Sequence, residues 1–185
     1  MSGKAGTDNR IYLVEGGENC GKSRYAESLF SSLSTSGIYI ATMIPYGKYG
    51  EEKIISHRKQ RAGLNLITKE YPYIDDCDII TVPQGSTVIL EDISNLTANR
   101  YFDRGEGLNE ILNCVINLSH RCHNLIIVGL RDLNKDGCDE KTVKYIELMD
   151  SVMDKLEEAA DCVILMKDNT AITLKPLNQY SDTVL

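Results

Sequence analysis

The sequence has no apolar run long enough to cross a bilayer, and it is short of positive charge. No stretch approaches the roughly 18 apolar residues of a membrane span. The chain has 27 acidic and 20 basic side chains, a net charge of −7, which disfavours binding along a nucleic-acid backbone. The first ten residues lack the apolar stretch of a signal peptide. These absences predict a cytoplasmic protein with no membrane span and no nucleic-acid partner.

The six cysteines include no CxxC pair, so the spacing of common zinc sites and redox motifs is missing. We therefore expect reduced thiols. The segment HRCH (residues 120–123) contains ligand-like side chains, but no partner cluster accompanies it elsewhere. We interpret this segment as the polar end of a helix rather than a metal site.

Short apolar runs alternate with longer amphipathic stretches from Ile11 onward. Runs of both kinds predict strands at residues 11–15, 37–42, 86–92 and 124–130, a possible strand at 64–68, and helices at 22–34, 51–61, 94–100, 108–121 and 141–160. The runs DCVILMK and AITLK, joined by an Asp-Asn turn, predict a hairpin. Strands separated by helices favour an α/β fold: a mostly parallel sheet with helices on both faces and a C-terminal antiparallel hairpin. Residues 71–85 give no clear pattern.

The segment GGENCGKS matches the pattern GxxxxGK[ST], and it lies between an apolar strand and an amphipathic helix. Glycines let successive backbone N–H groups converge on one concavity, and the helix N-terminus adds its positive end. Lys22 is expected to reach the outer phosphates of a nucleoside triphosphate, and the Ser23 hydroxyl to bind Mg²⁺. The alternative is a glycine-rich turn that only caps a helix. The predicted phosphate-binding residues are Gly16, Gly17, Glu18, Asn19, Cys20, Gly21, Lys22 and Ser23.

This motif predicts a P-loop NTPase-like sheet and a simple domain organisation. Residues 1–10 are small and polar, typical of a flexible N-terminal segment. Residues 11–185 contain no repeat and no linker, which predicts a single P-loop nucleotide-binding domain.

A metal site of this kind also needs an acid at the end of a neighbouring strand. The run STVILED supplies Glu91 and Asp92. Since alternate residues of a strand face opposite ways, we expect only one of them to face the nucleotide, and we prefer Glu91. The alternative is a strand that simply ends in solvated acids. Ser23 and Glu91 are thus the predicted Mg²⁺ ligands.

One basic segment, KIISHRKQR, stands out in this acidic chain. If it is helical, Lys53, His57 and Arg61 share one stripe at four-residue spacing. Neighbouring cations disfavour protonation of the imidazole, so a neutral His57 nitrogen would be able to attack phosphorus. The residues alone favour a solvated basic helix with an incidental histidine.

Five segments in order resemble a known family: GGENCGKSRYAE, YIAT, SHRKQR, TKE and VILEDISNLTAN. Together they are similar to the bifunctional adenosylcobinamide kinase and adenosylcobinamide-phosphate guanylyltransferase family of cobalamin assembly. The resemblance covers roughly the first half of the chain past residue 11, and the C-terminal half follows only the general pattern.

The resemblance implies two reactions and a set of residues for them. A nucleoside triphosphate, ATP or GTP, phosphorylates the side-chain hydroxyl of adenosylcobinamide. His57 then takes GMP from GTP and passes it to adenosylcobinamide phosphate. The family also implies Mg²⁺ and a homo-oligomer, with a trimer as its assembly. Beyond the phosphate loop, the implied nucleotide-binding residues are Ala41, Thr42, Met43, Arg58, Lys59, Gln60, Arg61, Glu70 and Glu91.

Two other functions remain open at this level. One is a P-loop kinase that acts on another small-molecule acceptor. The other is a GTP-binding regulatory protein without turnover. The presence of Lys22, Ser23, His57 and Glu91 in one chain favours catalysis, because a binding module needs no positioned nucleophile.

Overall fold

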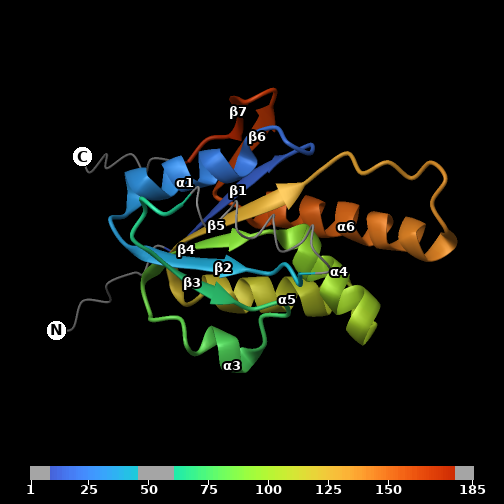
Figure 1. Ribbon diagram of the computed structural model, residues 1–185, viewed down its shortest axis with the longest axis horizontal. Coiled ribbons are helices and arrows are strands. Elements are labelled where there is room, and N and C mark those ends of the chain that lie inside the picture. Colours follow the sequence, from blue (N-terminus) through green and yellow to red (C-terminus); the bar gives the residue numbers. More distant parts are fainter. Residues whose placement is uncertain (1–8, 46–60, 178–185) are drawn as a thin grey trace, which may run out of the picture.

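The computed structural model describes residues 9–45 and 61–177, which form a seven-stranded sheet with helices on both faces (Figure 1). The elements are β1 (Arg10–Gly16), α1 (Lys22–Leu33), β2 (Gly37–Ala41), β3 (Leu66–Glu70), α3 (Asp76–Ile79), β4 (Ser86–Glu91), α4 (Ile93–Arg104), α5 (Leu108–Ser119), β5 (Cys122–Leu130), α6 (Glu140–Ala159), β6 (Cys162–Lys167) and β7 (Thr170–Lys175). The helix predicted at residues 51–61 lies outside the described residues except for Arg61.

The strand order is β3-β2-β4-β5-β1-β6-β7. Strands β1 to β6 pair in parallel, and β7 pairs antiparallel with β6 through a turn at Asp168 and Asn169. The mostly parallel α/β sheet and its C-terminal hairpin are therefore confirmed. Because parallel strands share one direction, their carboxyl ends meet at one edge of the sheet, as the arrowheads of β2 to β5 show (Figure 1).

Alternation along each strand builds two cores, one on each face of the sheet. Leu13 and Ile127 belong to the core beneath α4, α5 and α6, whereas Val14 and Val128 belong to the core beneath α1. All four side chains are buried. A parallel sheet that is buried on both faces needs such continuous apolar runs, and these runs made it possible to predict the strands from the sequence.

Some boundaries differ from the predictions. The segment 71–85 contains the short helix α3, and α4 continues past Arg100 to Arg104. The HRCH segment is divided between two elements: His120 is the C-cap of α5, whereas the buried Cys122 begins β5. All six cysteines are unpaired. In the described part of the chain, no helix combines the length and apolarity that crossing a membrane requires.

Candidate nucleotide site

The phosphate loop connects β1 to α1 and depends on two glycines. At Gly16, φ is +149°, and a Cβ there would lie 2.3 Å from the Met166 carbonyl oxygen. At Gly21, φ is +92°, and a Cβ would lie 2.7 Å from Asn169 Oδ1. L-residues rarely adopt such conformations, and neighbouring atoms already fill the space. The loop therefore packs closely against β6 and the β6–β7 turn.

The start of α1 leaves its backbone donors available for an anion. Gly21 provides no side-chain cap, and the first turn contains no acidic residue. The first N–H groups of a helix lack partners within the helix and carry the positive end of its dipole. A phosphate would satisfy both requirements.

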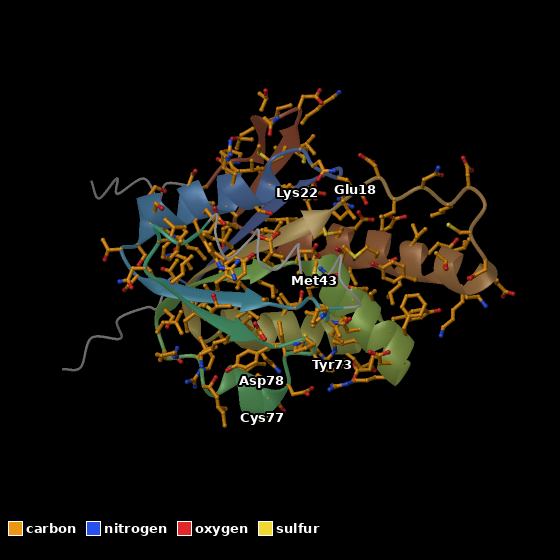
Figure 2. The ribbon with its side chains drawn as sticks, viewed as in Figure 1. Glu18, Lys22, Met43, Tyr73, Cys77 and Asp78 are labelled. Carbon is orange, nitrogen blue, oxygen red and sulfur yellow. The ribbon has the colours of Figure 1, made fainter. Side chains whose placement is uncertain are left out.

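Lys22 is the first residue of α1, and its Nζ folds back on the loop. It contacts the Gly17 carbonyl oxygen and lies 3.8 Å from Cys20 Sγ. Figure 2 shows Glu18 and Lys22 near the end of β1 and Met43 beyond the end of β2, at the same edge of the sheet. The ammonium thus stands where phosphate oxygens held by the loop would meet it.

The carboxylate of Glu91 meets the hydroxyl of Ser23. Ser23 Oγ donates to Glu91 Oε1 at 2.6 Å, although the two residues are 68 positions apart. Burial raises the pKa of Glu91 to about 7, and the hydrogen bond from Ser23 opposes that rise. Glu91 Oε2 is buried, and no hydrogen bond from the described residues reaches it. Glu91 ends β4, which is separated from β1 by β5, so the acid comes from the next strand but one, not from the immediate neighbour we expected.

The carboxylate of Asp92 caps a helix. It is the N-cap of α4, and its Oδ1 accepts from the backbone N–H groups of Ser94 at 2.6 Å and Asn95 at 3.0 Å. An N-cap carboxylate satisfies helix donors that would otherwise lack partners. The two adjacent acids therefore have different hydrogen-bond partners: Glu91 bonds to Ser23 at the end of the phosphate loop, and Asp92 caps the N-terminus of α4.

Thr42 fixes the junction between β4 and α4. Its Oγ1 lies 2.8 Å from the Asp92 carbonyl oxygen and accepts from the Asp92 N–H at 3.0 Å. Asn99 Nδ2 donates to the Thr42 carbonyl oxygen at 2.8 Å. Thr42 is fully buried, and these hydrogen bonds hold its side chain within the fold next to the site.

Arg61 and Tyr39 lie at the β3 end of the site, away from the phosphate loop. The Arg61 guanidinium carbon lies 3.8 Å from the centroid of the Tyr39 ring, and Nη2 donates to Thr68 Oγ1 at 3.4 Å. Arg61 is 6% exposed and Tyr39 2%. Burial raises the pKa of Tyr39, and the negative charge of Glu91 adds to that rise. A stacked guanidinium of this kind keeps its orientation and its N–H donors.

These parts border one cavity of about 760 Å³ along the carboxyl edge of the sheet. A cavity of this size suits a nucleotide or a drug-sized ligand. Eleven of the residues suggested by the sequence line it: Glu18, Asn19, Cys20, Gly21, Lys22, Ser23, Ala41, Met43, Arg61, Glu70 and Glu91. Gly16, Gly17 and Thr42 are not among the residues that line it. His57, Arg58, Lys59 and Gln60 lie outside the described residues.

Further lining residues were missed at the sequence level. They are Arg24, Tyr39, Asp92, Ser94, Asn95, Val128, Leu130 and Asn169. Several follow the ends of parallel strands, where ligands of open α/β sheets bind. The rule that the carboxyl ends of strands meet would have indicated Leu130 and Asn169.

Within the parts of the chain that are described, no cluster of three His, Cys, Asp or Glu side chains could hold a metal ion. Mg²⁺ needs no such cluster, because it is usually held by one or two protein groups together with phosphates and water. The pairing of Ser23 Oγ with Glu91 and the buried, unpartnered Glu91 Oε2 fit that kind of site.

Arg131 links α6 to β1, the strand that leads into the phosphate loop. Its Nε donates to Glu15 Oε2 at 2.8 Å, Nη1 to Asp154 at 2.7 Å and Nη2 to Glu157 at 2.8 Å. Its backbone N–H donates to the Gly16 carbonyl oxygen at 3.0 Å. Burial raises the pKa of Glu15, which is 3% exposed, and Arg131 opposes that rise.

We expect Arg131→Ala to lower the free energy of unfolding by about 3 to 5 kcal/mol at neutral pH, because it leaves the Glu15 charge buried without a partner. The loss should shrink as pH falls, since protonation of Glu15 removes the unpaired charge. Urea denaturation at pH 8 and pH 5 measures both effects. Lys144→Ala, which breaks only the exposed pair with Glu140, should cost no more than about 0.5 kcal/mol. Equal losses in the two variants would contradict a buried role for Arg131.

The chain matches one family over nearly its whole length. Residues 12–180 match the model of the cobinamide kinase / cobinamide phosphate guanyltransferase family. The bifunctional adenosylcobalamin biosynthesis protein CobU of Escherichia coli (strain K12) is 22% identical over 181 residues, which cover 89% of this chain and 99% of that protein. The family match includes the C-terminal half, where single motifs are hard to recognise.

Solved structures share the fold. A Pyrococcus horikoshii OT3 protein superposes with a TM-score of 0.56 at 12% identity, over 92% of this chain and 88% of its own. A prototypical ATPase from the type III secretion system of pathogenic bacteria gives 0.51 at 14% identity, over 86% and 51%. A further ATPase domain gives 0.50 at 10% identity, over 92% and 78%. The last two support a P-loop NTPase-like fold and say nothing about the substrate.

Proposed function

Because the chain belongs to the cobinamide kinase / cobinamide phosphate guanyltransferase family, we propose that it is a nucleotide-dependent transferase of cobalamin biosynthesis. It phosphorylates the side-chain hydroxyl of adenosylcobinamide and then transfers GMP from GTP to the resulting phosphate. The observation that carries this proposal is the meeting of Lys22, Ser23 and Glu91 at the phosphate loop beneath a nucleotide-sized cavity. Residues 11–185 serve as a single nucleotide-binding domain.

Phosphoryl transfer depends mainly on positioning and on charge stabilisation. The loop N–H groups and the first turn of α1 bind the phosphates, and Lys22 balances the charge that develops on the leaving oxygens. The acceptor hydroxyl oxygen forms a bond to the terminal phosphorus, the bond to the nucleoside diphosphate breaks, and the hydroxyl proton is released. Bound Mg²⁺, held by Ser23 and Glu91, would supply further neutralising charge.

His57 is the proposed nucleophile of the second reaction. Its neutral imidazole nitrogen attacks the α-phosphorus of GTP, a P–N bond forms, and pyrophosphate leaves. The phosphate of adenosylcobinamide phosphate then attacks, and the imidazole is the leaving group. Met43 and Arg61 precede and follow the segment that contains His57, and both line the cavity, which supports a role for His57 there. The proposed nucleotide contacts of Arg58, Lys59 and Gln60 belong to the same segment.

The proposed kinase reaction is tested by incubating the protein with Mg²⁺, adenosylcobinamide and either ATP or GTP. Mass spectrometry of the corrinoid should show a gain of one phosphate. A second incubation of that product with GTP should show a gain of GMP. Nucleotide hydrolysis or binding without either product would favour another acceptor or a regulatory role.

Glu91→Gln should weaken the binding of Mg²⁺ during turnover more than Asp92→Asn does. Glu91 faces the phosphate loop, whereas Asp92 is engaged as a helix cap, and asparagine caps a helix about as well as aspartate. We expect the Mg²⁺ concentration for half-maximal turnover to rise at least about tenfold in the first variant and to change less than about threefold in the second, in line with losses at other metal sites. Titration of kinase turnover with Mg²⁺ measures both values. The reverse order would assign the metal to Asp92.

A further inference from the structure

The cavity extends along the sheet edge well beyond the phosphate loop. Neighbouring strands lie about 4.8 Å apart, so the five spacings from β3 to β6 cover roughly 24 Å. Arg61 and Glu70 line the cavity at the β3 end, and Asn169 of the β6–β7 turn lines it at the other end. The phosphate loop follows β1, immediately beside β6. A nucleotide held by its phosphates therefore has two directions open to its nucleoside.

Asn169 is fixed against the loop. Its φ of +61° is in the left-handed region, and its N–H donates to the Cys20 carbonyl oxygen at 3.2 Å. Its Oδ1 lies 2.7 Å from the point where a Cβ on Gly21 would be. The residue is exposed to the cavity. The turn thus presents a carboxamide, which combines one acceptor with two donors, directly beside the start of α1.

We propose that Asn169 is a nucleoside-binding residue that recognises the adenine of ATP, an inference that rests on the proposed nucleotide-dependent function. A carboxamide donates to N7 and accepts from the N6 amino group of adenine in a bidentate contact. Guanine presents two acceptors on that edge, O6 and N7, and an arginine such as Arg61 matches those instead. ATP, as phosphoryl donor, directs its base toward the β6–β7 turn, and GTP, as guanylyl donor, directs its base toward Arg61.

The test compares two glycine variants of the same turn. Asn169→Gly removes the carboxamide but suits the positive φ, and Asp168→Gly makes the same change at the neighbouring residue, whose φ is +48°. Full-length proteins are titrated calorimetrically with the β,γ-imido analogues of ATP and GTP in the presence of Mg²⁺. We expect Asn169→Gly to raise the dissociation constant of the ATP analogue by about 5- to 150-fold, the range of a bidentate base contact.

The same variant should leave the affinity for the GTP analogue within about twofold, and Asp168→Gly should leave both within about twofold. An equal loss for both analogues in Asn169→Gly, or no loss for either, would overturn the role of Asn169 in adenine recognition while the nucleotide site stands. A wild-type protein that binds neither analogue would instead overturn the proposed function, and this inference with it.

Discussion

Lys22→Ala should lower kcat/KM for nucleotide-dependent phosphorylation by about 10²- to 10³-fold and leave the protein folded. The lysine begins α1, and the hydrogen bonds of its Nζ among the described residues stay within the loop: it contacts the Gly17 carbonyl oxygen and lies 3.8 Å from Cys20 Sγ. Removing a single donor that faces the developing negative charge of a transition state costs about 2.7 to 4 kcal/mol in other enzymes. Little apolar surface is lost with it, so stability should change by less than about 1 kcal/mol.

Steady-state turnover and thermal unfolding of the variant measure the two effects. Lys155→Ala is a matched control, because this lysine forms an exposed pair with Glu158 on α6. That control should keep turnover within about twofold of the wild type. Turnover of Lys22→Ala within a few-fold of the wild type would contradict a phosphate-binding role for the loop. A large drop in its unfolding temperature would indicate a structural role.

The parts of the fold that depend on local patterns were predictable from the sequence. The apolar runs of β1, β4 and β5 have no polar face, since both sides of a parallel sheet are covered. The phosphate loop was predictable because its glycines, Lys22 and Ser23 are contiguous. Alternation along the strand led us to prefer Glu91 over Asp92; Glu91 accepts a hydrogen bond from Ser23, whereas the Asp92 carboxylate caps α4.

Other features depend on contacts between distant segments, and local patterns do not specify them. Arg131 meets Glu15 across 116 positions, and Tyr39 is covered by Arg61 from beyond the undescribed residues 46–60. The hairpin turn was expected at Asp168 and Asn169, but its contact with Gly21 depends on β6 lying beside β1. Thr42 was linked to the nucleotide only by the family resemblance, and the sequence did not indicate that its hydroxyl would bond to the Asp92 backbone. These contacts could be predicted only after the order of the strands in the sheet was known.

His57→Ala should abolish a covalent guanylyl adduct that the wild-type protein forms with Mg²⁺ and GTP. Three observations support this expectation: His57 lies in the one basic segment of an acidic chain, Arg61 of that segment lines the cavity, and the family performs guanylyl transfer. In the proposed attack, the cations of this segment would balance the charge on the α-phosphate. The phosphoramidate bond should be labile in acid and stable in alkali.

His123→Ala is the matched control, because this exposed histidine lies at the start of β5, at the opposite edge of the sheet from the cavity. Intact-mass spectrometry of the wild type and the two variants after incubation with Mg²⁺ and GTP is the decisive measurement. We expect a mass increase of one GMP in the wild type and in His123→Ala, and none in His57→Ala. The same increase in His57→Ala, or its absence from the wild type, would contradict a guanylyl transfer mechanism through His57.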